Sequence, residues 1–469
     1  MEFSSNFPNF IAESLSKLKE TKAKQASVFY LTKLQNVDFK KIVLSLFQAY
    51  EKSFFWSDPL NEISFFSFSE FYFVKENGKN RFLYFDKKIK IYFDPVFSNF
   101  KDNETIPFAI PLYFVAAKFL PESNPNLWKS FDDLYIFSPK WTVIQYKDDV
   151  YALNRFFITS DSKEQDTIVK FNNVLNSFVE ISKSNVELEN PKFANVDIKN
   201  PKEKKKFAEK IKIALEKIEE KELEKIVISR SVEVPFQNEP KIGLYLFKLI
   251  EQYPECKIYG FRSGKSTFFG ASPETLLRIH NGTLLIEALA GTAPRGKDFE
   301  EDLKFEKELL ESEKNLREHE FVVEHIIEVL KNKNFDNIKI ERNKIKKLSN
   351  LQHIQTIVTA PISNEIGIFE IIDKLHPTPA VAGKPQQEAI NFIKKIEEHE
   401  RGLYSGFIGR IDVNLNCDIV LGLRCGLIEN KKLYAFAGNG IAQGSSPIEE
   451  AHENELKLQT IVNLIKNEN

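Results

Sequence analysis

Residues 257–289, KIYGFRSGKSTFFGASPETLLRIHNGTLLIEAL, alternate short apolar runs with Gly, Ser, Pro and Asn. Short runs rich in Ile, Phe, Tyr and Leu, separated by such turn residues, are typical of antiparallel strands. The segment therefore predicts consecutive strands at KIYGFRSG, KSTFFGAS and TLLRIHNGTLLIEAL.

The same pattern continues on both sides of this segment. Strands are predicted at KIVISRSVEV (225–234), GFIGRIDVN (406–414), DIVLGLRCGLI (418–428) and KLYAFAGNG (432–440). An amphipathic helix is predicted over 202–223, because apolar residues recur there at spacings of three and four. Further helices are predicted at 242–252, 301–332, 388–399 and 447–466.

The first half of the chain is rich in aromatic residues and poor in glycine. Helices are predicted at 7–25, 38–52 and 162–185, with aromatic strands between them at 63–75, 80–94, 110–120, 134–147 and 151–158. The polar, Pro-containing segment 186–202 is the candidate boundary between a β-rich half, 1–195, and a catalytic region, 196–469. The predicted class is α+β, with a sheet-rich core and helices outside.

Composition excludes several classes of protein. With 65 Lys and Arg against 67 Asp and Glu, the formal charge is −2, which gives no global attraction to nucleic acid or anionic membranes. The three cysteines form no CxxC pair, which argues against a zinc site or a disulfide framework. No signal sequence or membrane-spanning apolar run is present, so a cytoplasmic enzyme is expected.

Carboxylates on two predicted helices are candidates for binding a metal. Asn315 and Glu318 share one helix face, and Glu450, Glu453 and Lys457 follow one another along another helix. Such carboxylates can close on a hard cation such as Mg²⁺. An ordinary solvated helix face is the alternative explanation, and the pattern alone favours it.

Other candidates lie at strand ends and glycine turns. Arg424, among apolar neighbours, needs an anionic partner, either a substrate carboxylate or an internal salt bridge. Lys225 and Glu274 begin apolar strands and could act as base and acid, although such charges are more often structural. His376, in LHPTPAVAG, is by itself more often a loop histidine. The glycine turns match no nucleotide-binding loop, so the residues alone indicate a metal-assisted enzyme of an anionic substrate.

Taken together, the segments of 203–465 resemble the chorismate-utilising family of isochorismate, salicylate, anthranilate and aminodeoxychorismate synthases. The matching segments, in the family's order, are KIVISR, FFGASPETLLR, EALAGTAPRG, LLESEKNLREHEFVVEHI, LHPTPAVAG, ERGLYSGFIGRID, LGLRCGLI and YAFAGNGIAQGSSPIEEAHENELKLQTI. The first 195 residues match faintly, through FFWSDP and LWKSFDDLYIFSPKW. The resemblance implies one large fold like that of anthranilate synthase component I, with stacked, mostly antiparallel sheets flanked by helices. The boundary near 195 would then be a seam within one domain.

The resemblance also favours one branch of the family. Anthranilate and aminodeoxychorismate synthases typically carry LxRND and TxSGAPK-like segments, where this chain has FVVEHIIEVL and TPAVAGKPQQEA. Aminodeoxychorismate synthases commonly have Lys in the turn where this chain has Ala290, and Lys225 matches the lysine that activates water in the isochorismate and salicylate branches. The resemblance therefore implies an isomerase, an isochorismate synthase that adds water at C2 of chorismate and removes the C4 hydroxyl.

Site roles follow from the same resemblance. Mg²⁺ would be held by Glu318 and Glu453, with Glu450 acting through water; Lys225 would be the general base and Glu274 the general acid. Substrate-binding residues would be Ala290, Gly291, Thr292, His376, Tyr404, Arg424, Gly438, Gly440 and Lys457. Asn315 stands where many relatives have an acidic residue that supports the metal ligands, and other aromatic residues replace Tyr404 in relatives.

Two alternatives remain. A salicylate synthase would make isochorismate and then eliminate pyruvate with the same acid, base and metal ligands. A partner-dependent or catalytically silent chorismate-binding protein would have no reason to keep all of Lys225, Glu274, Glu318 and Glu453. The expected protein is a monomer or homodimer without a glutaminase subunit, and its product would serve menaquinone or siderophore biosynthesis.

Overall fold

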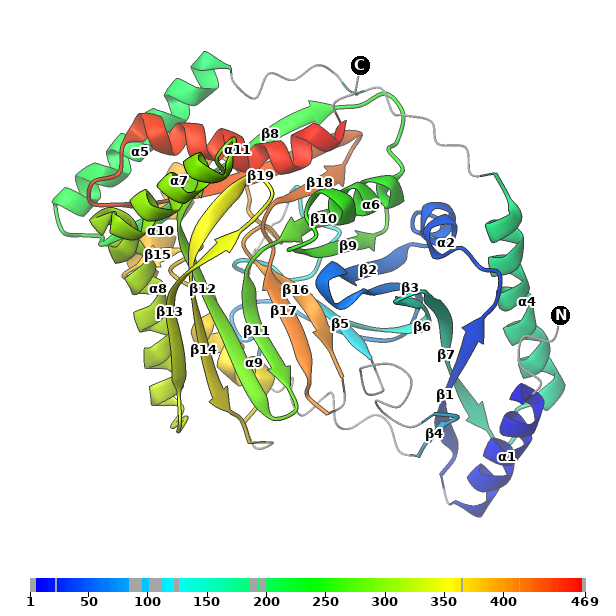
Figure 1. Ribbon diagram of the computed structural model, residues 1–469. Coiled ribbons are helices and arrows are strands. Elements are labelled where there is room, and N and C mark those ends of the chain that lie inside the picture. The colour runs from blue at the N-terminus through cyan, green and yellow to red at the C-terminus, as the bar shows by residue number, and fades with distance from the viewer. Residues whose placement is uncertain are drawn as a thin grey trace.

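The computed structural model shows layers of strands flanked on several sides by helices (Figure 1). It describes residues 6–21, 23–83, 95–100, 112–121, 126–185, 193, 200–363, 366–412 and 414–465. Most of the predicted strand at 80–94 and most of the predicted connector at 186–202 lie outside the described residues; the described part of that strand, 80–83, is a turn. The α+β class is confirmed.

The segment quoted at the outset folds into four strands rather than three. These strands are β9 (Lys257–Ser263), β10 (Ser266–Ser272), β11 (Thr275–His280) and β12 (Thr283–Pro294). The single strand predicted over 275–289 is in fact a hairpin, because Asn281 and Gly282 both adopt positive φ, 48° and 74°. An Asn-Gly pair of this kind makes the tight turn that matches the twist of two antiparallel strands.

Strands of the first half pair directly with strands of the second. The first-half strands are β1 (Gln25–Leu34), β2 (Lys52–Asp58), β3 (Ile63–Glu76), β4 (Val96–Ser98), β5 (Tyr113–Ala117), β6 (Leu134–Tyr146) and β7 (Asp149–Thr159). β2 runs antiparallel to β9, and β5 runs antiparallel to β16 (Phe407–Ile411). The two halves therefore share one hydrogen-bonded strand network.

The remaining strands complete the catalytic region. They are β8 (Lys225–Pro235), β13 (Lys339–Lys347), β14 (Leu351–Pro361), β15 (Gly383–Lys384), β17 (Cys417–Leu421), β18 (Cys425–Glu429) and β19 (Lys432–Ala442). The predicted strand over 418–428 is two strands, β17 and β18, separated by a break that contains Arg424 with φ +47°. Among the described pairings only β1 with β4 is parallel, so the predicted antiparallel character is confirmed.

Helices cover the outer faces of the strands. They are α1 (Phe7–Glu20), α2 (Phe39–Leu46), α4 (Glu164–Lys183), α5 (Pro201–Glu219), α6 (Ile242–Gln252), α7 (Phe299–Glu311), α8 (Glu313–Asn332), α9 (Ile368–Leu375), α10 (Gln386–Ile396) and α11 (Pro447–Ile465). The helix predicted over 301–332 is interrupted at Ser312, whose hydroxyl accepts from the backbone N–H of Asn315 at 3.3 Å and so begins α8. α9 has no counterpart among the predicted helices.

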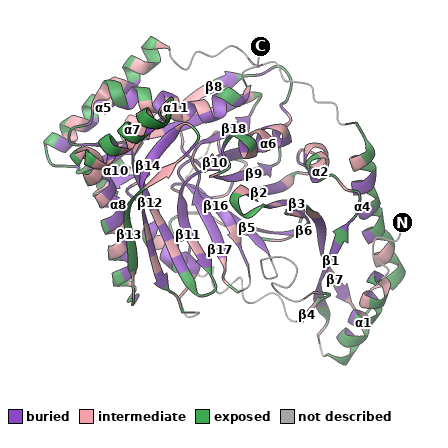
Figure 2. Cartoon of the chain, in the orientation of Figure 1, coloured by how far each residue is buried: buried purple, intermediate pink, exposed green. Residues whose placement is uncertain are grey.

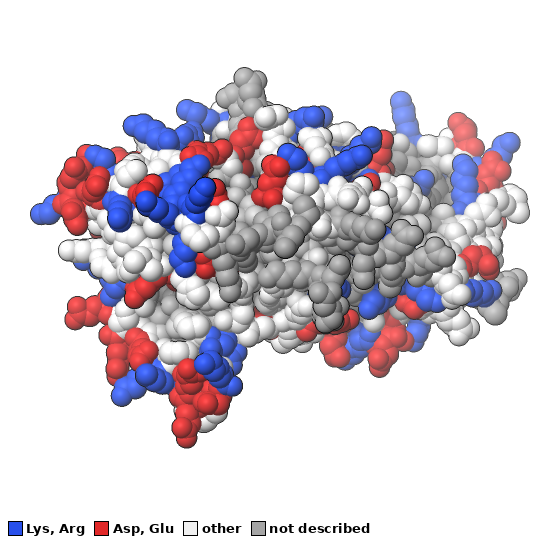
Figure 3. Space-filling view, turned by 90° about the horizontal axis from the view of Figure 1, so that it is seen from above, with Lys and Arg blue, Asp and Glu red and all other residues white. Residues whose placement is uncertain are grey.

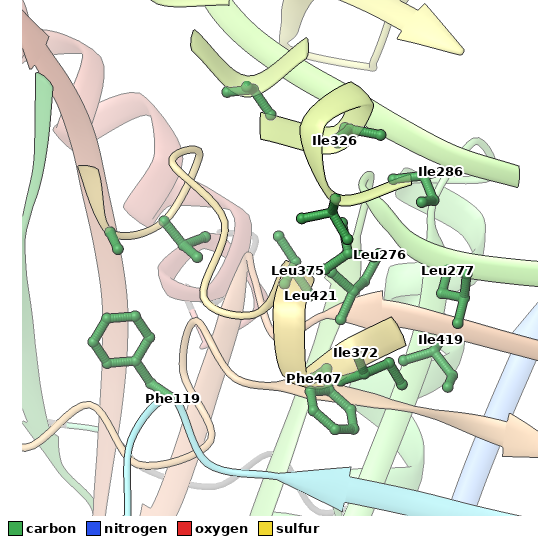
Figure 4. Close-up of a cluster of buried hydrophobic side chains, with 14 of the residues drawn as sticks. Phe119, Leu276, Leu277, Ile286, Ile326, Ile372, Leu375, Phe407, Ile419 and Leu421 are labelled. Carbon is green, nitrogen blue, oxygen red and sulfur yellow. The ribbon is translucent and has the colours of Figure 1, made fainter. Parts of the chain in front are cut away.

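Three large apolar clusters explain this layering. One, with aromatic residues such as Trp56, Trp128 and Phe436, takes its residues from strands and loops and fills the space between strand layers. A second packs α5, α8, α9 and α10 against strands; Figure 4 shows Ile326 of α8 and Ile372 of α9 beside Leu276 and Ile286. A third packs α1, α2, α4, α6 and α11. Buried residues accordingly follow the strands, and exposed residues follow the outer helix faces (Figure 2).

The described surface carries mixed charge. On the face in Figure 3, Lys and Arg side chains are interspersed with Asp and Glu side chains, as the nearly neutral composition leads one to expect. Within the described part of the chain, no helix is long and apolar enough to cross a membrane.

Candidate active site

One pocket gathers most of the predicted site residues from distant parts of the chain. The predicted residues that line it are Glu274, Ala290, Gly291, Thr292, Glu318, Tyr404, Arg424, Gly438, Gly440, Glu450, Glu453 and Lys457. They come from the end of β10, from β12, α8, β19 and α11, and from the loops before β16 and between β17 and β18. The strand layers and the flanking helices thus meet at this pocket.

The acid corner consists of Glu274, which lines the pocket, and of Glu287 and Lys346, which lie behind the pocket lining. Glu274 follows Pro273 at the end of β10 and is only 4% exposed. Burial, with a further contribution from the negative charge of Glu287, raises the pKa of Glu274 to about 8. At neutral pH this carboxyl is therefore mostly protonated and can donate a proton.

The neighbours of Glu287 keep its side chain ionised, in contrast to the protonated Glu274. Its carboxylate accepts from the backbone N–H of Thr275 at 2.8 Å, from Gln355 Nε2 at 2.6 Å and from Lys346 Nζ at 3.1 Å. Burial works against ionisation, but Lys346 and Thr275 outweigh it and keep the pKa of Glu287 below its ordinary value. Its lasting negative charge adds to burial in opposing the ionisation of Glu274.

A carboxylate–lysine cluster forms another wall of the pocket. Its members are Glu318, Glu450, Glu453, Lys225, Lys314 and Lys457. Each carboxylate has its own lysine: Glu318 lies 3.2 Å from Lys225, Glu450 lies 2.6 Å from Lys314, and Glu453 lies 2.6 Å from Lys457. The carboxylates that the sequence placed on two separate helices are therefore brought to one pocket.

Ionisation within this cluster depends on the balance of charges. Burial disfavours the charged form of Glu318, yet Lys225 and Lys314 hold its pKa below the ordinary value. The pKa of Glu450 is raised by burial and then by the negative charge of Glu453, against the effect of Lys314. The cluster therefore keeps negative charges crowded together, which an added cation would relieve.

Lys225 sits behind the pocket lining rather than on it. It opens β8, is fully buried and reaches the pocket through its ion pair with Glu318. Gly440, on the neighbouring strand β19, leaves room for this pair: a Cβ on Gly440 would lie 2.0 Å from Glu318 Oε1 and 3.1 Å from Lys225 Cε. A side chain at this position would displace the Glu318 carboxylate from its place beside Lys225.

The cluster offers the donor type that Mg²⁺ prefers. Glu318, Glu450 and Glu453 present carboxylate oxygens to one pocket, and the missing side chain at Gly440 keeps the space beside Glu318 open. Across the described residues, no three acidic, His or Cys side chains already form a closed metal cage. Mg²⁺ does not require one, because it is commonly held by one or two carboxylates together with water and substrate oxygens. The residues fit such an ion.

Arg424 forms a cationic corner opposite in charge to the carboxylates. It lies in the break between β17 and β18 rather than in a strand, and its positive φ of 47° is an uncommon conformation that turns the chain here. None of the ion pairs found among the described residues uses its guanidinium; instead its NH2 group donates to His353 Nε2 at 3.2 Å. The guanidinium is thus available to a carboxylate in the pocket.

His353, which sequence reasoning missed, orients Arg424. An arginine can only donate, so His353 Nε2 must accept and the ring proton must be on Nδ1. That nitrogen lies 3.1 Å from Thr292 Oγ1 and 3.3 Å from the carbonyl of Gly291. Burial and then Arg424 hold the pKa of His353 far below its ordinary value, so the ring is neutral. The signal in the sequence was a single His within the apolar run LQHIQTIV.

Tyr404 and Lys457 border Gly438 of β19; the glycine turn predicted at 436–440 is in fact continuous strand, because β19 pairs with β8 without a break from Lys432 to Ala442. The Tyr404 ring stacks on Phe436, with centroids 5.3 Å apart, and a Cβ on Gly438 would lie 2.6 Å from the Tyr404 hydroxyl oxygen. Lys457 Nζ donates to the carbonyl of Gly438 at 3.1 Å. This part of β19 therefore brings backbone, phenol and ammonium groups to one side of the pocket.

The structure places His376 outside this pocket, contrary to the prediction. Its ring packs edge-on against Phe119 and Phe407, and its Nε2 lies 3.1 Å from the carbonyl of Phe119. Burial lowers the pKa of His376 to about 3, so the ring is neutral. Only the later part of the same loop, Ala380 and Val381, reaches the pocket. The histidine instead lines a different cavity, which it shares with Arg81, Phe119 and Asp133.

Comparison with known proteins gives the site a context. Residues 13–466 match the family of chorismate binding enzymes. Isochorismate synthase MenF of Bacillus subtilis is 28% identical over 425 residues, which are 88% of each chain. A protein of Pseudomonas aeruginosa named salicylate biosynthesis isochorismate synthase is 34% identical over 264 residues, 55% of this chain and 54% of its own length.

Solved structures agree on the fold. The menaquinone-specific isochorismate synthase MenF of Escherichia coli is 19% identical with a TM-score of 0.74, and covers 97% of this chain and 100% of its own. Anthranilate synthase component I of Streptococcus pneumoniae is 17% identical with a TM-score of 0.65, and covers 86% of this chain and 92% of its own. At these identities the likeness concerns the fold, and the predicted anthranilate synthase component I-like fold is confirmed.

Proposed function

The chain belongs to the chorismate binding enzyme family, and from this premise we propose that it is an isochorismate synthase, an isomerase that converts chorismate to isochorismate. The observation that carries the proposal is Glu274, a buried and mostly neutral carboxyl in the same pocket as the carboxylate–lysine cluster. The named relatives give further support, since isochorismate synthases are among them.

The proposed reaction needs one residue as a general base and another as a general acid. Water attacks C2 of the ring, and Lys225 accepts a proton from that water. Glu274 donates its proton to the hydroxyl on C4, which leaves as water while the double bonds shift. One water enters and one leaves, so substrate and product have equal mass. Lys225 can accept a proton only as the neutral amine, so this role requires that Glu318 be released from their ion pair.

Charged groups of the pocket match a substrate with two carboxylates. Arg424, oriented by His353, would bind the enolpyruvyl carboxylate together with Tyr404 and the backbone at Gly438. Glu318 and Glu453 would hold Mg²⁺ directly and Glu450 would hold it through water. When bound, this ion supplies positive charge that neutralises and orients the ring carboxylate.

The test is a product analysis of the purified chain with chorismate and Mg²⁺, without ammonia or glutamine. A new compound of the same mass as chorismate, separated by chromatography, is the expected result; the Glu274→Gln protein serves as the matched blank. Salicylate with pyruvate would transfer the chain to the salicylate synthase branch. Unchanged chorismate would contradict the proposal and revive a partner-dependent or silent protein.

The same preparation tests the remaining parts of the proposal. We expect a cytoplasmic enzyme, a monomer or homodimer that works without a glutaminase subunit. Activity of the isolated chain with chorismate and Mg²⁺ would support independence from a glutaminase subunit, whereas turnover only with an added glutaminase subunit would contradict it. Relatives concerned with menaquinone and with salicylate are both among the matches, so the pathway that uses the product is left open.

A further inference from the structure

A chain of buried hydrogen bonds runs from a surface cavity to Glu450. Arg230 Nε donates to Asn454 Oδ1 at 2.7 Å, Asn454 Nδ2 donates to Asn439 Oδ1 at 3.1 Å, and Asn439 Nδ2 donates to Glu450 Oε2 at 3.0 Å. Both asparagines are fully buried. Arg230 lies on β8, Asn439 on β19, and Asn454 and Glu450 on α11, so the chain links two paired strands to the helix that packs on them.

The direction of this chain is fixed from its arginine end. Arginine has no acceptor, so Asn454 must turn its carbonyl oxygen toward Arg230 and its amide nitrogen toward Asn439. Asn439 must then accept with its own carbonyl oxygen, and its amide nitrogen faces Glu450. Each link forces the next, and Glu450 always receives a donor.

The other oxygen of Glu450 is held as well. Lys314 Nζ donates to Glu450 Oε1 at 2.6 Å, and the hydroxyl of Ser445 donates to the same oxygen at 2.9 Å. Contacts on both oxygens fix the plane of the carboxylate as well as its position. A carboxylate held in this way is pre-oriented for a cation or for a water bound to one.

The far end of the chain reaches the surface. Arg230 lines a small cavity with Lys206, Lys210, Glu398 and His399, and its guanidinium lies 5.6 Å from the ring centroid of Phe207. The guanidinium is thus held at the edge of the molecule. Its N–H group fixes the amide orientation of Asn454, and Asn454 in turn fixes that of Asn439, which donates to Glu450.

We propose that Arg230, Asn454 and Asn439 form a positioning relay that orients Glu450 for cation binding in the pocket. The inference rests on the proposed function, because it takes Glu450 as part of a Mg²⁺ site. None of the three residues lines the pocket, so each acts through Glu450. The affinity of the pocket for a divalent cation should therefore depend on residues that never touch the cation or the substrate.

Asn454→Asp separates a relay from a merely structural contact. The aspartate keeps its contact with Arg230 and gains an ion pair, but it can no longer donate to Asn439. Asn439 must then turn its amide nitrogen toward residue 454, which leaves its carbonyl oxygen facing Glu450. Added negative charge alone would strengthen cation binding, whereas a broken relay weakens it, so the two explanations predict opposite signs.

The experiment measures binding of Mn²⁺ by the purified full chain, without chorismate, from the electron paramagnetic resonance signal of the free ion. We expect the Kd for Mn²⁺ to rise about 10-fold or more in Asn454→Asp, the size typical of lost support around a metal ligand. Asn154→Ala, another buried asparagine, on β7 far along the chain, is the matched control and should bind as the wild type does.

Arg230 gives a second, independent test should Asn454→Asp fail to fold. Arg230→Gln keeps a donor for Asn454 and should retain the wild-type Kd, whereas Arg230→Met removes the donor and should raise it. Wild-type affinity in both Asn454→Asp and Arg230→Met would overturn the relay alone. Absence of Mn²⁺ binding by the wild type would overturn the cation site and the relay with it, while the product analysis would still decide the reaction.

Discussion

Glu274 and Glu318 are both buried glutamates lining one pocket, yet their surroundings put them in opposite protonation states. In the acid corner, burial and the nearby charge of Glu287 raise the pKa of Glu274 to about 8. In the carboxylate–lysine cluster, Lys225 and Lys314 overcome burial and lower the pKa of Glu318. Because both glutamates are buried, the charges of their neighbours account for the difference between their protonation states, and these states suit the acid role proposed for Glu274 and the ligand role proposed for Glu318.

The largest effect is expected from Glu274→Gln in the acid corner. Gln cannot supply the proton, so kcat should fall by about 10²–10⁴-fold, the usual contribution of a positioned acid. Binding of Mn²⁺ should stay unchanged, because the cluster is intact. Steady-state kinetics together with metal titration checks both parts, and kcat within a few-fold of wild type would remove Glu274 from its role.

Lys225→Ala should give a comparable loss of activity with a different signature. Removing the ammonium leaves the buried Glu318 without its partner, so the free energy of unfolding should drop, by about 3–5 kcal/mol for a fully buried pair. The same change removes a competitor for Glu318, so Mn²⁺ should bind more tightly than to wild type. Thermal unfolding with and without Mn²⁺ measures this, and weaker metal binding would contradict the arrangement of the cluster.

A smaller effect is expected for Glu453→Gln. Loss of one carboxylate should weaken Mn²⁺ and chorismate binding together, by about 10-fold or more, and excess Mg²⁺ should recover part of the activity. Glu449→Gln, an exposed neighbour on the same helix, is the matched control. An unchanged Mg²⁺ dependence in Glu453→Gln would remove this residue from the metal site.

The smallest effect concerns the pH dependence set by the acid corner. Activity that needs protonated Glu274 should decline as pH rises through about 8. Because Glu287 raises the pKa of Glu274 and Lys346 lowers it, Glu287→Gln should move this decline to lower pH, and Lys346→Met to higher pH. Profiles of kcat/KM against pH measure both shifts. Shifts of the same sign in the two variants would contradict the conclusion that Glu287 and Lys346 act on the pKa of Glu274 in opposite directions.

The carboxyl group of Glu274 also makes the free energy of unfolding depend on pH. Between pH 4.5 and about 8 the folded Glu274 keeps a proton that the unfolded chain has released. The folded state then binds more protons, so the contribution of Glu274 to stability falls as pH rises across this window. Glu274→Gln should flatten that part of the stability curve in denaturant titrations.

Local patterns in the sequence predicted the α+β fold class and most helices and strands. They failed where single residues change the direction of the backbone. Asn281 and Gly282 divide one predicted strand into a hairpin, Ser312 divides a predicted helix, and Arg424 separates β17 from β18. In each case the apolar pattern continues across the break, so periodicity alone shows no interruption. Tertiary packing and side-chain capping decide these points.

The site followed the same division. Glu274, the three carboxylates and the glycines of β19 share one pocket, and the family motifs had marked these residues in order, although the turn predicted at those glycines is a strand. His376 was expected in the pocket and His353 was overlooked, because a motif marks a position in the chain, whereas burial and partners decide which way a side chain points. The pairs Lys225–Glu318 and Lys314–Glu450 and the Asn439–Asn454 link join separate elements, which no local pattern reveals.

The pairing of β2 with β9 and of β5 with β16 has a practical consequence for anyone who would express the motif-bearing region alone. A fragment that begins near residue 196 would lose both partner strands, and the open backbone groups of β9 and β16 would become templates for other chains. The apolar surface released with them belongs to the aromatic cluster between the layers. Such a truncation should aggregate into inclusion bodies rather than yield a smaller working enzyme.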